Sequence, residues 1–233
     1  MSTAALVLAA GRGDRLGAGR AKAAVLLGGR PLASWCLETI ATVDGVTEVV
    51  LVGDAAELAP VLAVLSPAAR ARITRVVPGG ATRQESCARG LDALTGACDV
   101  VLIHDAARPF AGAALFAQVA DAARRTGAAL CAVPLADTLK RVESGRVLAT
   151  VERAGLWSAQ TPQGARAVLL QTAHRAAAEE GVVATDDVAL LERLGHAAEV
   201  VTGSVINRKI TTPEDLAWAE AWLAARSGHG AAR

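Results

Sequence analysis

The chain has 233 residues, of which 52% are hydrophobic, and its 24 Lys and Arg nearly balance its 23 Asp and Glu, giving a net charge of +1. This size and apolar content predict one domain over residues 1–226, followed by a flexible tail at residues 227–233. Because the charges nearly cancel, the composition excludes a general basic surface for nucleic acid or an anionic membrane, so any anion has to be bound locally.

The cysteines and the N-terminus indicate a cytoplasmic protein. Cys36, Cys87, Cys98 and Cys131 lack CxxC spacing and most lie in apolar or helical surroundings, which is typical of reduced core thiols. No basic region precedes the first apolar run, and this run ends at Gly11 after about seven residues, too few for a signal sequence or a membrane span. We also expect no further domain after the last helix.

Short β-rich apolar runs alternate with longer segments of helical periodicity. The expected strands are residues 4–8, 46–52, 73–77, 100–103 and 128–133. This alternation predicts an α/β, Rossmann-like fold with a mostly parallel twisted sheet and helices on both faces. Ligands of such sheets collect at the carboxyl ends of the strands, so we expect the site just after the strands.

The pattern changes to a β-hairpin within residues 136–158. Two short strands at residues 138–142 and 147–151 flank a turn at Ser144-Gly145. A lone two-stranded ribbon is marginally stable in water, so we expect this arm to pack on a second subunit and predict a homodimer.

The C-terminal part returns to helices. We expect helices at residues 165–178 and 186–194, a strand at 198–201 and a final helix at 213–225. The last helix has a strong start signal, because Thr212 supplies a cap, Pro213 a first-turn proline, and the next two residues are acidic.

The loop after the first strand, residues 9–22, holds four glycines and four cations in fourteen positions. Glycines let backbone N–H groups approach a phosphate chain, and arginine and lysine neutralise it. The loop therefore predicts a polyphosphate cradle; the alternative is a mobile, solvated loop. A dinucleotide fingerprint is excluded because Leu16 stands where its third glycine belongs, and no P-loop string occurs.

Five motifs together resemble one family. They are Ala9-Ala10-Gly11-x-Gly13-x-Arg15 followed by Lys22; His104-Asp105-Ala106-Ala107-Arg108-Pro109; Asp137-Thr138-x-Lys140; Thr161-Pro162-Gln163-Gly164; and Lys209-Ile210-Thr211-Thr212-Pro213-Glu214-Asp215. In this order and spacing they resemble the 2-C-methyl-D-erythritol 4-phosphate cytidylyltransferases, over nearly the whole chain. The first motif alone is shared with other nucleotidyltransferases that activate sugars and sugar alcohols.

The resemblance implies a reaction in which a phosphate oxygen of a polyol phosphate attacks the α-phosphorus of CTP and expels pyrophosphate. It assigns Arg15 and Lys22 to stabilising the transition state, and Arg153 and Lys209 to positioning the attacking oxygen. It also implies Mg²⁺ or another divalent cation, bound mainly by the CTP phosphates rather than by protein ligands.

The resemblance also assigns the nucleotide-binding residues. They are Ala9, Ala10, Gly11, Gly13, Gly80, Arg83, Ser86 and Asp105. Gly80, Arg83 and Ser86 fall where the relatives recognise cytosine; taken alone, this stretch is equally well an ordinary strand-to-helix turn.

Asp105, Arg108, Thr138, Arg153, Thr185 and Lys209 match acceptor-binding positions of the family. Taken alone, Asp105 pairs with Arg108 or caps a helix, and Thr185 begins a helix cap followed by first-turn acids. The resemblance implies that Thr138 and Arg153 reach across the dimer to the acceptor. We interpret His104 as a structural neighbour rather than a general base, because an ionised phosphate needs no deprotonation.

The chain departs from the family pattern beside two functional lysines. Alanines flank Lys22, at positions 21 and 23, where relatives have proline and glutamine, and Arg208 replaces an aliphatic residue before Lys209. We expect these changes to alter the loop and to affect substrate affinity more than reaction type.

Three other functions fit part of the pattern. A cytidylyltransferase for ribitol 5-phosphate shares the fold and most motifs, although residues 152–157 and 207–209 favour methylerythritol phosphate. A silent nucleotide-binding regulator has no chemical reason to keep Arg15, Lys22, Arg153 and Lys209 together. A dinucleotide-dependent dehydrogenase needs the glycine that Leu16 replaces.

Overall fold

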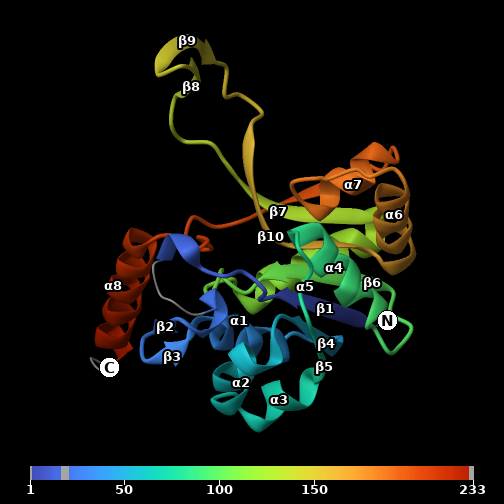
Figure 1. Cartoon of the computed structure of the whole chain (residues 1–233). Helices are drawn as coiled ribbons and strands as arrows, with labels where there is room; N and C mark the ends of the chain where they lie inside the picture. Colours follow the sequence, from blue (N-terminus) through green and yellow to red (C-terminus); the bar gives the residue numbers. More distant parts are fainter. Residues whose placement is uncertain (1, 17–20, 231–233) are drawn as a thin grey trace.

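A twisted sheet of seven strands forms the centre of the protein (Figure 1). The computed structural model describes residues 2–16 and 21–230. The strand order is β11-β7-β10-β6-β1-β4-β5. In chain order the strands are β1 (Thr3–Leu8), β4 (Val46–Val52), β5 (Ile73–Val77), β6 (Val100–Asp105), β7 (Ala128–Pro134), β10 (Trp157–Arg166) and β11 (Glu199–Thr202). All neighbours pair in parallel except β10, so the expected α/β fold with a mostly parallel sheet is confirmed.

Helices cover both faces of this sheet. Successive side chains of each buried strand point to opposite faces, so both faces carry apolar side chains that the helices bury. Leu102 of β6 packs with α1 (Leu32–Ala41), α2 (Ala55–Ala63) and α5 (Ala113–Thr126), and α3 (Pro67–Arg72) lies beside α1. Its neighbours Val101 and Ile103 pack with α4 (Arg83–Asp92), α6 (Ala167–Glu179) and α7 (Asp187–Arg193). Cys36, Cys87 and Cys131 lie in these two cores, Cys98 is half-buried, and all four are free thiols.

β10 is the element that the sequence did not predict. We expected a helix from residue 165, whereas an antiparallel strand lies between β6 and β7 and α6 begins only at Ala167. β10 is rich in small and polar residues, and α5 packs so closely on it that little space is left for larger side chains. A Cβ on Gly164 would lie 2.9 Å from Leu102 Cδ2 and 3.1 Å from Val119 Cγ1.

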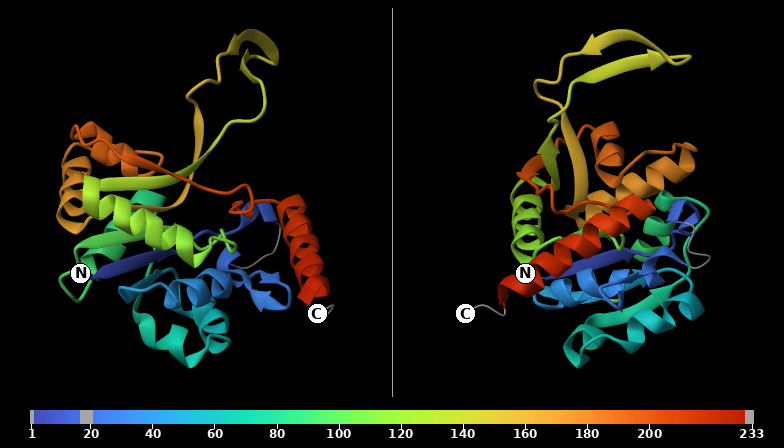
Figure 2. Two further views of the ribbon diagram at one scale, coloured as in Figure 1. Left: turned by 180° about the vertical axis from the view of Figure 1, so that it is seen from behind. Right: turned by 90° about the vertical axis from the view of Figure 1, so that its left-hand side faces the viewer.

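The hairpin arm forms as expected, from β8 (Leu139–Glu143) and β9 (Arg146–Val151). Ser144 and Gly145 both have positive φ angles, 49° and 76°, the conformation of a tight type I′ hairpin turn. The arm projects far from the body of the protein (Figures 1 and 2). Its apolar side chains Val142, Val147 and Leu148 are 55–62% exposed, which is unusual for neighbours on one ribbon.

The last helix, α8, runs from Pro213 to Gly230 beside the short hairpin of β2 (Leu26–Leu27) and β3 (Arg30–Pro31). Its cap is the expected one, since Thr212 Oγ1 accepts a hydrogen bond from Asp215 N. The helix continues beyond residue 225, into residues that we assigned to the tail, because no proline or cap interrupts its backbone hydrogen bonds there. Within the described part of the chain, no helix has the length and apolarity needed to cross a membrane.

Leu102→Ala tests the role of β6 in the core that packs with α1, α2 and α5. Leu102 is fully buried, so we expect the substitution to lower the free energy of unfolding by about 2–5 kcal/mol. The matched control is Val168→Ala on α6, where the side chain is 72% exposed and the loss should stay within about 0.5 kcal/mol. Urea denaturation measures both values, and similar losses in the two variants would contradict the assignment.

Candidate functional site

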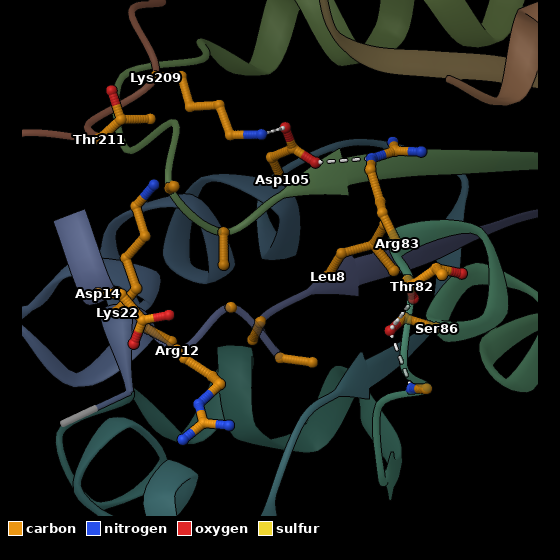
Figure 3. Close-up of a pocket in the computed structure, with 18 of the residues that line it drawn as sticks. Leu8, Arg12, Asp14, Lys22, Thr82, Arg83, Ser86, Asp105, Lys209 and Thr211 are labelled. Atoms are coloured by element: carbon orange, nitrogen blue, oxygen red, sulfur yellow. Dashed lines mark hydrogen bonds and ion pairs between the residues drawn. The ribbon is translucent and has the colours of Figure 1, made fainter. Parts of the chain in front are cut away.

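A pocket of about 640 Å³ lies at the carboxyl ends of β1 and β6, where the sequence placed the site (Figure 3). This volume suits a nucleotide-sized ligand. The pocket is lined by Leu8, Ala9, Ala10, Gly11, Arg12, Gly13, Asp14, Lys22, Ala23, Gly80, Ala81, Thr82, Arg83, Ser86, Asp105, Ala106, Ala107, Lys209 and Thr211. The loops after the first and fourth predicted strands therefore share one site, as expected.

The glycine-rich loop forms one side of the pocket. Gly13 has a φ of 74°, which favours glycine, and its carbonyl accepts a hydrogen bond from Leu16 N in the 3-10 turn Asp14–Leu16. Lys22 N donates to Gly11 O, 3.1 Å away, so the two ends of the loop are held together. Residues 17–20 and the side chain of Arg15 lie outside what the structure describes. Lys22 itself lines the pocket, across from Arg83 and Ser86 (Figure 3).

The alanines beside Lys22 leave the local backbone in a proline-like shape. Ala21 has a φ of −52°, inside the range of about −65 ± 15° that a proline ring imposes. Ala21 and Ala23 are both buried, and Lys22 opens the 3-10 turn Lys22–Ala24. At Ala21, the backbone therefore retains a φ that proline favours.

The opposite side of the pocket is the turn before α4. Thr82 Oγ1 accepts from Glu85 N, and Glu85 Oε2 accepts from Ala81 N, a variant of the capping box in which the acid reaches the residue before the cap. Ser86 Oγ accepts from Gly80 N at 3.0 Å and donates to Thr82 O at 2.9 Å, so this hydroxyl shapes the turn.

The two sides touch behind the pocket at Gly79. A Cβ at this position would collide with Cβ of Ala10, so only glycine lets the α4 turn approach the glycine-rich loop so closely. The two loops therefore form one packed unit.

Asp105, at the end of β6, is surrounded by cations. Its Oδ2 lies 2.7 Å from Lys209 Nζ and 4.0 Å from Arg108 Nε, and its Oδ1 lies 3.4 Å from Arg83 Nε. Burial alone would raise the pKa of this carboxyl, but the positive charges of Lys209, Arg83 and Arg108 hold it well below its usual range. Asp105 is therefore ionised, and it holds Lys209 in the pocket.

Arg108 lies behind this carboxylate rather than among the pocket-lining residues. Its Nη1 donates to Asn207 O at 2.8 Å, which fixes the segment that carries Lys209. His104 supports the same turn, since Nε2 lies 3.0 Å from Arg108 O and Nδ1 lies 3.1 Å from Thr161 Oγ1. Burial lowers the pKa of His104 to about 4, so the imidazole is neutral.

Arg208, the other departure from the family pattern, anchors the segment to α8. Its Nη2 lies 2.7 Å from Asp215 Oδ1, and its guanidinium stacks over the Trp218 ring at 5.6 Å. Arg208 is thus paired with α8 rather than with Asp105, and its neighbour Lys209 is the cation of this segment that lines the pocket.

Besides Arg108, three other predicted acceptor residues do not line the pocket. Thr138 and Arg153 are exposed on the arm, and Thr185 is exposed in the loop before α7. The cap of α7 is Asp186, whose Oδ1 accepts from Ala189 N, so the interpretation of Thr185 as the cap was wrong. Asp186 suits the cap because its carboxylate accepts from a first-turn N–H group and its negative charge faces the positive end of the helix.

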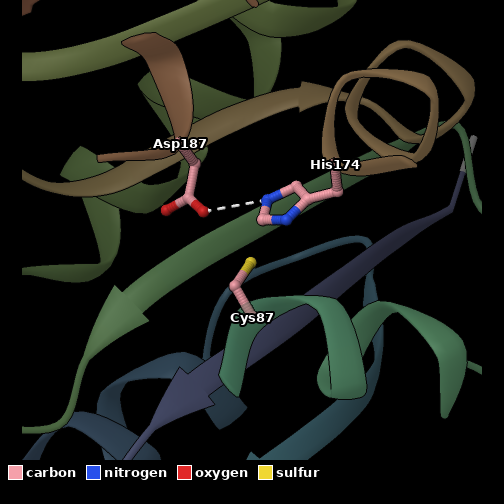
Figure 4. A group of neighbouring side chains, drawn as sticks. All are labelled: Cys87, His174 and Asp187. Carbon is pink, nitrogen blue, oxygen red and sulfur yellow. Dashed lines mark hydrogen bonds and ion pairs between the residues drawn. The ribbon is translucent and has the colours of Figure 1, made fainter. Parts of the chain in front are cut away.

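Asp187 is an important residue that the sequence did not single out. It is the first-turn acid that the sequence predicted, but it is 2% exposed and its Oδ2 lies 2.6 Å from Arg83 Nη1. His174 Nε2 lies 3.1 Å from the other oxygen (Figure 4). Burial opposes ionisation of Asp187, yet the His174 hydrogen bond and the charge of Arg83 hold its pKa below the usual value.

Comparisons with known proteins point to one family. The family model for IspD, 2-C-methyl-D-erythritol 4-phosphate cytidylyltransferase, matches residues 3–225. A 2-C-methyl-D-erythritol 4-phosphate cytidylyltransferase from Prochlorococcus marinus is 43% identical over 223 residues, which cover 95% of this chain and 98% of that protein. The relative of the same name from Geobacillus kaustophilus is 41% identical, with 97% and 99% covered.

Solved structures agree. 4-Diphosphocytidyl-2C-methyl-D-erythritol synthase from Anaerococcus prevotii superposes with a TM-score of 0.83 at 30% identity, covering 96% of both chains. 2-C-Methyl-D-erythritol 4-phosphate cytidylyltransferase from Thermus thermophilus gives 0.78 at 36% identity, covering 95% of this chain and 98% of that one. The similarity therefore includes the pocket and the arm.

Asp105→Asn removes the charge that the three cations share. Because the folded pKa lies below the ordinary value of 3.8, the carboxylate contributes stability that is fully present above about pH 4 and lost as pH falls through the lowered pKa. We expect the variant to lose about 2–3 kcal/mol of unfolding free energy at pH 7, and this difference to shrink only below about pH 4. Urea denaturation from pH 3 to 8 measures it.

The control is Asp121→Asn, which removes a carboxylate that is 70% exposed and pairs with Arg124 at 2.6 Å. Its loss should stay below about 1 kcal/mol at every pH. Equal stability of Asp105→Asn and the unmodified protein at pH 7 would refute the role given to Asp105.

Proposed function

Because the chain belongs to the IspD family of 2-C-methyl-D-erythritol 4-phosphate cytidylyltransferases, we propose that it joins CMP from CTP to 2-C-methyl-D-erythritol 4-phosphate. The products are 4-diphosphocytidyl-2-C-methyl-D-erythritol and pyrophosphate, in non-mevalonate isoprenoid precursor synthesis. The enzyme is a nucleotidyltransferase. The observation that carries this proposal is the pocket that Lys22, Arg83, Asp105 and Lys209 line together, although they come from four separate segments of the chain. We place the enzyme in the cytoplasm.

CTP lies along the pocket, with its triphosphate on the glycine-rich loop. Backbone N–H groups of Ala9, Ala10, Gly11 and Gly13 approach the phosphates, and Arg15 and Lys22 neutralise them. The base is directed to Gly80, Arg83 and Ser86, where the narrow capped turn limits the space for a purine. Asp105 takes the ribose hydroxyls.

The reaction forms a bond from the acceptor phosphate oxygen to the α-phosphorus and breaks the bond from that phosphorus to the bridging oxygen of pyrophosphate. The electron pair of the broken bond leaves with pyrophosphate. Negative charge increases on the α-phosphoryl oxygens, and Lys22 and Arg15 stabilise it as fixed cations. No protein base is required, because the attacking phosphate is already ionised.

The acceptor phosphate binds at Lys209, which Asp105 holds at 2.7 Å. Arg108 supports this position through Asn207. Arg153 and Thr138 reach the same acceptor from the arm of a second subunit. The exposed apolar side chains of the arm support a homodimer, since a partner would cover them. Thr185 completes the acceptor contacts.

The pocket also fits a divalent cation. Asp14 and Asp105 line it, and carboxylate and phosphate oxygens are the ligands that Mg²⁺ prefers. Mg²⁺ would be held mainly by the triphosphate, with the Asp14 carboxylate as the protein oxygen that is not already paired with cations of the Asp105 cluster. When bound, it neutralises phosphate charge.

Pyrophosphate release tests the function. The protein is incubated with each of the four NTPs and with either 2-C-methyl-D-erythritol 4-phosphate or ribitol 5-phosphate, and we expect release with CTP and the first acceptor. Release with ribitol phosphate alone would reassign the acceptor. CTP binding without release from any pair would instead indicate a silent regulator.

Lys22→Ala tests the transition-state role. We expect kcat for pyrophosphate release to fall by about 100-fold or more, with a smaller change in KM for CTP, because the cation acts on charge that develops during the reaction. Arg15→Ala should have an effect of similar size. The control, Arg125→Ala, removes an exposed cation paired with Glu199 near the opposite end of the sheet and should leave kcat unchanged. A loss confined to KM would contradict the assignment.

Mixing two inactive variants tests whether the arm completes the partner's site. Lys22→Ala inactivates the pocket of its own subunit, whereas Arg153→Ala should inactivate the pocket of its partner. Random reassembly of equal amounts makes half of the dimers mixed, each with one intact site, so about a quarter of the wild-type activity should return. If each arm serves its own subunit, mixing restores nothing, and the proposed arrangement is wrong.

A further inference from the structure

A chain of hydrogen bonds and ion pairs leads from the core behind α4 to the pocket. It runs from His174 through Asp187, Arg83 and Asp105 to Lys209, with successive contacts of 3.1, 2.6, 3.4 and 2.7 Å. The last three residues line the pocket, whereas His174 and Asp187 lie outside its lining (Figures 3 and 4). A pocket arginine is therefore bound on its far side by a carboxylate that no ligand in the pocket reaches directly.

Two carboxylates determine where the Arg83 guanidinium lies. Nη1 pairs with Asp187 and Nε with Asp105, while Nη2 is buried and makes no hydrogen bond within the described part of the chain. The bond to Asp187 is the shorter of the two by 0.8 Å, and Asp187 is 2% exposed on its side chain. Charge-assisted bonds of this kind are strong when they are short and shielded from water. Asp187 is therefore the main anchor of the guanidinium.

Asp187 is itself held by hydrogen bonds to His174 and Gln163, and Cys87 lies beside it. Its Oδ1 faces His174 Nε2, its backbone N–H donates to Gln163 Oε1 at 3.2 Å, and the Cys87 thiol lies within the same cluster. Sulfur, nitrogen and oxygen groups so close together resemble a metal-ligand set. Here, however, the His174–Asp187 contact has hydrogen-bond length, and the second Asp187 oxygen is taken by Arg83. Burial raises the pKa of Cys87 well above its usual value, so the group remains a thiol.

We propose that Asp187 is a positioning residue for CTP binding, which acts by holding the Arg83 guanidinium against Asp105 and so keeps the base and ribose side of the pocket in its binding shape. The proposal rests on the proposed function, because it takes CTP as the ligand. Without the Asp187 charge, Arg83 retains only the longer contact to Asp105 and is free to pair with it more closely. That movement would shift the carboxylate that also holds Lys209.

The first test compares CTP affinities of four proteins by calorimetry without acceptor: unmodified, Asp187→Asn, Arg83→Met and the double variant. Asp187→Asn keeps the size of the side chain and its ability to accept from His174. We expect it to weaken CTP binding about tenfold, the scale of one charge-assisted hydrogen bond. In kinetics the same variant should raise KM for CTP with kcat changed less than about twofold, the opposite of Lys22→Ala.

The double variant shows whether Asp187 acts through Arg83. If it does, Asp187→Asn has no further effect on CTP affinity once Arg83 is methionine, because the group that it positions is gone. The double variant should also be more stable to heat than Arg83→Met alone, since no buried carboxylate is then left without its cation.

Cys87→Ala is the matched control in the same cluster. It removes a fully buried side chain beside His174 and Asp187 and lowers stability, but it should leave CTP affinity within about twofold of the unmodified protein. The proposal is overturned if Cys87→Ala weakens CTP as much as Asp187→Asn, or if the effects of Asp187→Asn and Arg83→Met simply multiply. If the protein binds CTP but releases no pyrophosphate, the proposed function is refuted. Calorimetry of CTP binding still tests the role of Asp187 in that case.

Discussion

The carboxylate of Asp105 holds together parts of the chain that would otherwise repel one another. Lys209, Arg83 and Arg108 come from three different segments and converge on two oxygen atoms at the end of β6. A buried carboxylate is costly in free energy unless it is paired, and cations so close together are costly unless a negative charge lies between them. Pairing the carboxylate with the cations offsets both costs. The cations are therefore arranged in the pocket before any anion arrives.

Several neighbouring elements hold Asp105 and its cations in this arrangement. β6 is the fully buried neighbour of β1, so its end is held rigidly beside the glycine-rich loop. The hydroxyl of Thr161, on β10, accepts from Asp105 N and fixes the start of the turn. Asn207 joins Thr161 O to the segment of Lys209 through Nδ2, 2.8 Å from that carbonyl. An active site of this kind gains rate from groups that do not need to reorganise during the reaction.

The sequence was informative where the signal is local. β4 and β5 were predicted to the residue, because each is an apolar, β-branched-rich run bounded by turn or helix signals. The glycine-rich loop was found because its composition is unusual. β10 was missed because its buried polar residues are satisfied by partners far away, as Gln163 is by Asp186 and Asp187. Asp187 was missed for the same reason: its partner Arg83 is 104 residues away, and no local pattern distinguishes a paired acid from a solvated one.

Lys22 and Lys209 are also notable because lysine is rare in this chain. Of the 24 cationic residues of the chain only three are lysines, the third being Lys140 of the arm, and the remainder are arginines. A primary amine is a compact point charge, whereas a guanidinium is a planar fork that spreads its charge. A chain that uses arginine almost everywhere else thus keeps an amine on both sides of its pocket. Two of the three lysine amines therefore lie in this one pocket, and Lys140 of the arm is the third target of an amine-directed reagent.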